Sequence, residues 1–325
     1  MDAHPRRSSA PASVDRASSE PASSVIPDNL SPGGVGRMLP HLVRAMRPRQ
    51  WTKNVVVLAA LVFDLKLFHL GHIVTASAAF VAFCLAASGL YLINDIRDRD
   101  ADRLHPIKRR RPIASGELPV PVAGGAAAVL LLAGAGVALL VRPPLLAVLG
   151  AYVVLMLLYS FWLKHEVIVD VFAISGGFVL RAAAGAVALA VPISPWLYVC
   201  AALLSLFVAF GKRRHELSLL DRDARGHRRN LDEYSLPLLD QFLVITTAAT
   251  IMAYSLYTFV ATNVPRNESM MLTIPFVVYA MFRYLYLVMR RERGGAPEQV
   301  LFSDRPLLAA IVLWGITAIA ILYTS

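Results

Sequence analysis

Apolar runs separated by short polar segments occupy the chain from Trp51 to its end. A membrane-spanning helix needs about 20 predominantly apolar residues, and several segments approach that length. The first of them is the weakest, because Asp64 and Lys66 interrupt its far end. The pattern predicts an all-α integral membrane protein with nine transmembrane helices. The predicted spans cover residues 51–69, 73–93, 120–141, 144–163, 167–191, 194–211, 238–261, 272–290 and 306–323.

The segment before the first span is rich in Ser, Pro and Ala and holds few bulky apolar residues. Such a composition buries too little apolar surface to fold, so we expect a disordered N-terminal tail over residues 1–36. No apolar stretch follows a charged start, and we therefore expect no cleavable signal peptide. Residues 37–325 are predicted to form a single polytopic membrane domain.

Composition agrees with this pattern. Hydrophobic residues make up 57% of the chain and charged residues 17%, with a mean hydropathy of +0.57. Soluble proteins hold about 25% charged residues, so a pair of soluble domains is excluded. Cys84 and Cys200 lie within apolar runs, and we expect neither a disulfide nor a cysteine-bound metal.

The net charge of +10 belongs to a predicted membrane protein, in which basic residues flank the spans, and it does not indicate a nucleic-acid partner. With a cytoplasmic N-terminus, the outer loops hold only Lys66, Arg142 and Arg266, and most other Lys and Arg residues fall in inner segments. The positive-inside rule then predicts a multi-pass protein of the plasma (inner) membrane, with its N-terminus inside. The long inner connections 94–119 and 212–237 also carry acidic groups, which topology does not require.

Acidic residues gather where the second span ends. At 100° per residue, Asp95, Asp98 and Asp102 fall within about 60° of arc, and Asp100 lies on another side. Carboxylate oxygens on one face suit Mg²⁺, which bridges to substrate phosphates. The alternative is a solvated helix end paired with neighbouring arginines.

Basic residues follow the acidic motif along the chain. Lys108 and Arg111 could bind an anionic substrate, or they could help to orient the protein in the membrane and contact anionic lipid.

In the fifth span Asp170 and Arg181 are eleven residues apart, so they share a helix face with Gly177 between them. They could line a polar cavity, or they could form a structural pair between helices.

These motifs resemble those of a known family. Asn94-Asp95-x-x-Asp98-x-x-x-Asp102, followed by Arg111-Pro112-x-x-x-Gly116, resembles the first signature of the UbiA superfamily of intramembrane prenyltransferases. The resemblance covers about residues 40–325. It implies a bundle of nine helices with a cytoplasmic-side active site, where Asp95, Asp98 and Asp102 are catalytic and hold Mg²⁺.

The chain departs from the usual family pattern after the sixth span. Most members carry a second Asp-rich motif there, whereas this chain reads Lys212-Arg213-Arg214-His215-Glu216. Asp221 and Asp223 follow at a different spacing. A Lys-Arg cluster suits direct phosphate binding rather than a second bridging metal.

The departure resembles the decaprenyl-phosphate phosphoribosyltransferase branch of the superfamily. That resemblance implies transfer of 5-phosphoribosyl from phosphoribosyl pyrophosphate to a polyprenyl phosphate lipid, for a precursor of cell-wall arabinan. The implied substrate-binding residues are Gln50, Lys53, Asn54, Asn94, Lys108, Arg111, Tyr159, Lys164, Asp170, Arg181, Lys212, Arg213, Glu216 and Tyr234. An aromatic prenyltransferase that uses prenyl diphosphate, and more remotely a transporter of an anionic solute, are the alternatives. A homo-oligomer is left open.

Overall fold

The computed structural model describes residues 32–192, 194–220, 233–261, 264–291, 294–295 and 297–324. Its contacts divide the chain into residues 1–39 and residues 40–325, and the second unit holds the features described below. Helix α1 (Pro32–Met46) contributes residues to both units. The predicted tail lies mostly outside the described residues. Residues 32–36, which we expected to belong to it, form the start of α1 instead.

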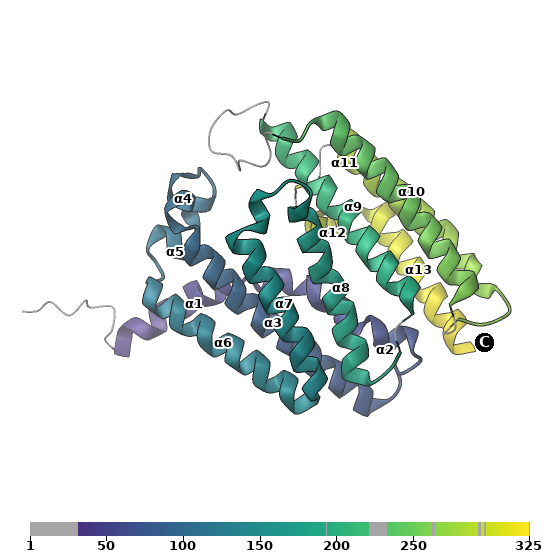
Figure 1. Cartoon of the computed structure of the whole chain (residues 1–325), viewed down its shortest axis with the longest axis horizontal. Helices are drawn as coiled ribbons and strands as arrows, with labels where there is room; N and C mark the ends of the chain where they lie inside the picture. Colours follow the sequence, from purple (N-terminus) through teal and green to yellow (C-terminus); the bar gives the residue numbers. More distant parts are fainter. Residues whose placement is uncertain are drawn as a thin grey trace, which may run out of the picture. The chain divides into compact units, whose positions relative to one another are not determined.

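The predicted all-α class is confirmed, because every regular element in the described residues is a helix (Figure 1). Eight of the described helical segments are long and apolar enough to cross a membrane. They are α3 (Leu70–Arg97), α6 (Val120–Val141), α7 (Pro143–Phe161), α8 (Val169–Leu189), α9 (Pro195–Leu220), α10 (Leu236–Val260), η6 with α11 (Ser269–Thr273 and Ile274–Arg291) and α13 (Arg305–Thr324).

The first predicted span differs from the prediction. Instead of one α-helix over 51–69, the chain forms a 3₁₀ helix η2 (Pro48–Leu58) and a short α2 (Ala59–Phe63). Three consecutive valines at 55–57 restrict side-chain rotamers in an α-helix, and Leu65 adopts a left-handed φ of 58° that ends the helical path. A 3₁₀ helix rises more steeply than an α-helix, so residues 48–63 still cover about 30 Å.

Short helices fill the first long connection. After α3 come α4 (Arg99–Leu104), η3 (Lys108–Arg110) and α5 (Pro112–Ser115). Gly116 ends α5 with a φ of 87°, a conformation that favours glycine over any other residue. Likewise η4 (Leu163–His165) joins α7 to α8, and α12 (Pro297–Ser303) precedes α13.

The predicted end of the sixth span was too early. Helix α9 continues to Leu220, so the basic stretch from Lys212 to Glu216 is helical rather than part of a loop. Glu216 lies 3.9 Å from Lys212, and its carboxylate also accepts a hydrogen bond from Arg213. Such pairs, three or four residues apart, favour continuation of the helix.

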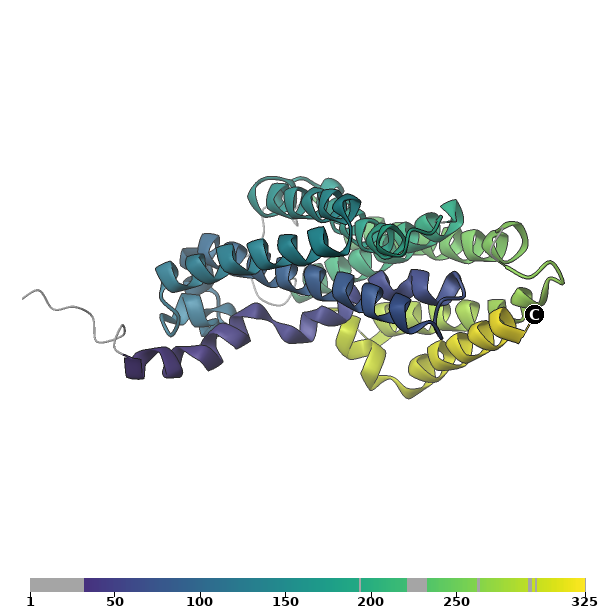
Figure 2. The same ribbon diagram turned by 90° about the horizontal axis from the view of Figure 1, so that it is seen from below.

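Two groups of helices meet at α8 and α9 within residues 40–325. Helix α3 contacts α6, α7, α8 and η2, and α9 contacts α10. Figure 2 shows α11 and α13 side by side in the C-terminal part of this unit, in agreement with their contacts. Close helix crossings have small residues at the contact: a Cβ at Gly134 of α6 would lie 3.0 Å from the carbonyl oxygen of Ala82 of α3.

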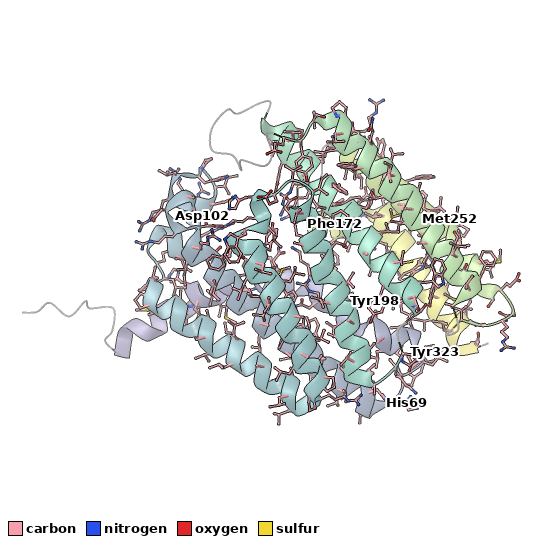
Figure 3. The ribbon with its side chains drawn as sticks, in the orientation of Figure 1. His69, Asp102, Phe172, Tyr198, Met252 and Tyr323 are labelled. Carbon is pink, nitrogen blue, oxygen red and sulfur yellow. The ribbon has the colours of Figure 1, made fainter. Side chains whose placement is uncertain are left out.

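The two ends of the helices differ in chemistry. Figure 3 shows Asp102 at one end and His69 with Tyr323 at the other. The Asp102 end brings together the end of α3, the start of α8 and the end of α9, each of which carries charged side chains. This is the end at which the predicted site residues gather.

Candidate active site

The first acidic motif lies where α3 gives way to α4. Asp95 belongs to the last turn of α3, Asp98 joins the two helices, and Asp102 lies in α4. Asp95 and Asp102 are buried, whereas the Asp100 side chain is 91% exposed. The prediction that Asp100 points away from the other carboxylates is confirmed.

Arginines from two segments hold the buried carboxylates. Arg111 Nη1 lies 3.1 Å from Asp95 Oδ1 and 2.6 Å from Asp102 Oδ2, so it bridges the two. Arg47 Nη2 donates to the same oxygen of Asp95 at 2.5 Å, and its guanidinium stands 5.0 Å from the centre of the Tyr91 ring. Arg47 has a φ of 56°, a strained value for a residue with a side chain.

Asp98 faces a different partner. Its Oδ1 accepts a hydrogen bond from Lys164 Nζ at 2.7 Å, and its Oδ2 accepts one from Asn94 Nδ2 at 3.2 Å. Lys164 belongs to η4, at the entrance to α8, and is buried. The predicted residues Asn94, Asp98 and Lys164 are therefore brought together.

The geometry changes the predicted metal site. In the described part of the chain, no group of three or more His, Cys, Asp or Glu side chains converges closely enough to hold a metal ion. Asp98 turns toward Lys164, while Asp95 and Asp102 share Arg111. Mg²⁺ usually binds through one or two carboxylates, several waters and the phosphates of a substrate. The hard oxygens of the motif fit the ion in that form, but not as a closed cage of three carboxylates.

Electrostatics also distinguish the carboxylates. Burial raises the pKa of the Asp102 carboxyl, and the charges of Arg111 and Lys108 oppose that rise. The predicted residue Lys108 is thus close enough to Asp102 to act on its charge. Negative charge on Asp102 depends on cations nearby.

A second cluster surrounds the end of α9. The buried Arg213 donates from Nε to Asp170 Oδ2 at 2.7 Å, and its Nη1 donates to Glu216. Tyr234 OH donates to Asp170 Oδ1 at 3.3 Å and accepts from the backbone N–H of Ile168 at 2.7 Å. Burial raises the pKa of Tyr234 to about 12, so its hydroxyl stays neutral near pH 7. Asp170 is fully buried and orients Arg213.

The same cluster includes residues from two further elements. Lys53 of η2 and Tyr159 of α7 lie close enough to Lys212 to interact electrostatically with its ammonium group. Gln50 lies one 3₁₀ turn before Lys53 on η2. The structure therefore gathers Lys53, Tyr159, Asp170, Lys212, Arg213, Glu216 and Tyr234 at one end of the helices.

Arg181 and Asn54 lie elsewhere. Both are buried, and Arg181 Nε donates to Asn54 Oδ1 at 2.7 Å. Arg181 also donates to Tyr152 OH at 2.8 Å and to the carbonyl of Gly177 at 2.9 Å. The predicted shared face of α8 is present, since Asp170, Gly177 and Arg181 are all buried. Asp170 nevertheless pairs with Arg213, and Arg181 is enclosed by packing rather than lining a polar cavity.

Sequence reasoning missed several partners. Arg47 pairs with a residue 48 positions away, which no local spacing indicates, although it stands in the basic stretch before the first span. Arg214 pairs with Asp240 of α10 at 2.5 Å, which ties α9 to α10. Asp221 and Asp223, whose spacing we considered, lie outside the described residues.

Comparisons with known proteins agree with this geometry. The profile of the UbiA prenyltransferase family matches residues 55–305. The chain is 36% identical to a decaprenyl-phosphate phosphoribosyltransferase of Corynebacterium glutamicum over 303 residues, which covers 91% of each chain. A Mycobacterium tuberculosis protein of the same name is 36% identical over 277 residues, 84% of this chain and 91% of that one.

A solved structure shares the fold. The UbiA homologue of Archaeoglobus fulgidus bound to GPP and Mg²⁺ superposes with a TM-score of 0.67 at 17% identity, over 87% of this chain and 100% of that one. The chain belongs to the UbiA prenyltransferase family.

Proposed function

We propose that this protein transfers the 5-phosphoribosyl group of phosphoribosyl pyrophosphate to a polyprenyl phosphate, decaprenyl phosphate, with release of pyrophosphate. The observation that carries the proposal is the cluster of Lys53, Lys212 and Arg213 at the end of α9, in place of the second Asp-rich motif that the resemblance to the superfamily implies. The names of the relatives from Corynebacterium and Mycobacterium support the same substrates.

The charges of the site suit these substrates. The donor carries a 5-phosphate and a diphosphate, and the acceptor carries a further phosphate. Ammonium and guanidinium groups from both clusters bind such anions directly. Groups whose positions are already fixed stabilise the phosphates without any cost of rearranging the site. Mg²⁺ would be held by one or two carboxylates of the motif formed by Asp95, Asp98 and Asp102, with Asn94 beside them, and by waters and the substrate phosphates. Bound there, the ion would neutralise charge on the departing pyrophosphate.

The reaction exchanges one bond at the anomeric carbon. An oxygen of the lipid phosphate forms a bond to C1 of the ribose while the bond from C1 to the pyrophosphate oxygen breaks, with inversion at C1. The lipid phosphate is already ionised, so no side chain has to remove a proton from it. Arg111 and Lys164, which ion pairs with Asp102 and Asp98 hold beside the acidic motif, stabilise the negative charge that develops on the leaving group. Lys108, which lies close enough to Asp102 to act on its charge, contributes to the same stabilisation.

The membrane placement follows from charge and length. We assign the end that carries Asp102 to the cytoplasmic face of the plasma membrane. We also assign η2 together with α2 as a membrane crossing, first in chain order, which brings the total to nine. The two helices together are about as long as a bilayer core is thick. The polyprenyl tail would lie among the lipid-facing helices. The product would supply arabinose units for cell-wall arabinan.

A paired-substrate assay tests the proposal. Purified protein in lipid nanodiscs receives Mg²⁺ and either phosphoribosyl pyrophosphate with decaprenyl phosphate, or a prenyl diphosphate with an aromatic acid. Mass analysis should find phosphoribosylated decaprenyl phosphate from the first pair and no product from the second. A prenylated aromatic product, with no phosphoribosyl lipid, would overturn the proposal.

A further inference from the structure

We infer that Gly185 and Arg181 of α8 are positioning residues. They seat η2, which means that they fix its position against α8, and they thereby determine the position of Lys53 relative to Lys212. We place neither residue in contact with substrate. The inference rests on the proposed function, because that function makes Lys53 and Lys212 donor-binding residues. Three sets of contacts between η2 and its neighbours carry it.

The first contact is a close approach of two backbones. A Cβ at position 185 would lie 1.9 Å from the carbonyl oxygen of Val57 in η2. Side chains can move aside from such a contact, but a backbone carbonyl within a helix cannot. Only glycine at position 185 therefore allows η2 to lie this close to α8.

The second contact is the hydrogen bond between Arg181 and Asn54. Arg181 lies one turn before Gly185, on the same side of α8, and roughly 18 Å from the helix start. An arginine at this depth of a membrane is costly without partners. The acceptors that the described residues offer to it are the neutral groups of Asn54, Tyr152 and Gly177. Arg181 thus fastens η2 and α7 to α8 rather than balancing a buried carboxylate.

The third set of contacts comes from α3. Trp51 Nε1 donates to Ser88 Oγ at 3.1 Å, and Asn54 Nδ2 donates to Cys84 Sγ at 3.2 Å. A 3₁₀ helix has poorer hydrogen-bond geometry than an α-helix and seldom runs beyond a few residues, so η2 depends on such outside contacts. Lys53 is the residue directly before Asn54, and a shift of η2 moves its ammonium group relative to Lys212.

Cys84 provides a readout that does not require activity. The chain holds two cysteines, so Cys200→Ser leaves the thiol of Cys84, which is buried beneath Asn54, as the single target for N-ethylmaleimide. In this background we compare Gly185→Ala, Asn54→Ala and Arg181→Gln with Gly150→Ala. Gly150 is the matched control, because a Cβ at that position in α7 meets nothing within 4 Å.

We expect the three test variants to label at Cys84 faster than the parent, and Gly150→Ala to label at the parental rate. Their kcat/KM for phosphoribosyl pyrophosphate should fall by about 100-fold, because a displacement of about 1 Å can have that effect. The KM for decaprenyl phosphate should stay within about twofold of the parental value. Asn54→Ala leaves Gly185 intact, so it serves as the test if Gly185→Ala does not fold.

Two results would overturn the inference: folded Gly185→Ala and Asn54→Ala proteins that keep Cys84 protected, or an exposed Cys84 with unchanged donor kinetics. A third result concerns the proposed function alone. If the parent transfers no phosphoribosyl group, that function falls, and the labelling rates still decide whether Gly185 and Asn54 seat η2.

Discussion

At the scale of single residues, the basic partners of the acidic motif determine how its carboxylates are arranged. Asp95 and Asp102 both form ion pairs with Arg111, whereas Asp98 forms an ion pair with Lys164, which belongs to a different part of the chain. Helical spacing indicated that Asp95 and Asp102 lie together and that Asp100 does not join them. It also grouped Asp98 with them, whereas Asp98 lies between α3 and α4 and faces Lys164. It could not indicate Arg47, since an ion pair over 48 positions depends on the tertiary fold.

The matched pair Asp98→Asn and Asp100→Asn tests the motif. The Asp98 side chain is 27% exposed and the Asp100 side chain 91%, so neither change should unfold the protein. We expect Asp98→Asn to lower kcat by about 100-fold or more, because it removes charge from the region that we propose binds the metal and the leaving group. Asp100→Asn should retain activity within about twofold. Steady-state transfer rates at saturating Mg²⁺ measure both, and equal activities would contradict the assignment.

Arg47 provides a second comparison at this scale. Arg47→Ala removes one of the two guanidinium partners of Asp95, and Arg49→Ala removes an exposed arginine two positions along. We expect Arg47→Ala to reduce kcat/KM for the donor by about 10-fold or more, the effect typical of residues that orient a metal-binding carboxylate. Arg49→Ala should have little effect. Similar losses in both variants would show that charge, and not the contact with Asp95, is what matters.

At the scale of elements, hydropathy predicted eight of the helical spans well, since length and apolarity are properties of the segments themselves. It did not predict η2, which lies close against Gly185 of α8, or the continuation of α9 through Lys212, Arg213 and Glu216. Charge composition suggested a loop there, whereas ion pairs along the helix keep it ordered.

Two ion pairs that join neighbouring helices differ in burial and should differ in strength. Asp170 with Arg213 is fully buried, whereas the Asp240 side chain, paired with Arg214, is 33% exposed. Removing one partner of a buried pair costs about 3–5 kcal/mol, whereas a solvent-exposed pair is worth up to about 1 kcal/mol. The Arg214–Asp240 pair, with side chains 13% and 33% exposed, falls between these two cases. We therefore expect Asp170→Asn to lower the unfolding midpoint in detergent far more than Asp240→Asn. Midpoint shifts of the same size would contradict this.

At the scale of the whole molecule, the charge distribution has both a topological and a chemical consequence. Basic residues gather at the end of the membrane helices that also holds Asp95 and Asp170. The sequence predicted this asymmetry, but the division of the charges into two clusters required the fold, because η2, α7, α8 and α9 each contribute to them.

Cysteine accessibility tests the orientation. In a background with Cys84 and Cys200 replaced by Ser, Ser115→Cys should react with an impermeant maleimide only from the cytoplasmic side. Asn267→Cys, which is exposed at the opposite end of the helices, should react only from outside. Labelling of intact cells and of inverted vesicles distinguishes the two sides. Reaction of Ser115→Cys in intact cells would contradict the assigned orientation.

The fate of individual atoms of the donor tests phosphoribosyl transfer directly. Phosphoribosyl pyrophosphate carrying ¹⁴C in the ribose and ³²P either in the 5-phosphate or in the β-phosphate is incubated with the protein, Mg²⁺ and decaprenyl phosphate. We expect ¹⁴C and the 5-phosphate label to enter the lipid together, and the β-phosphate label to leave as soluble pyrophosphate. Appearance of the β-phosphate label in the lipid, or absence of ¹⁴C from it, would contradict phosphoribosyl transfer.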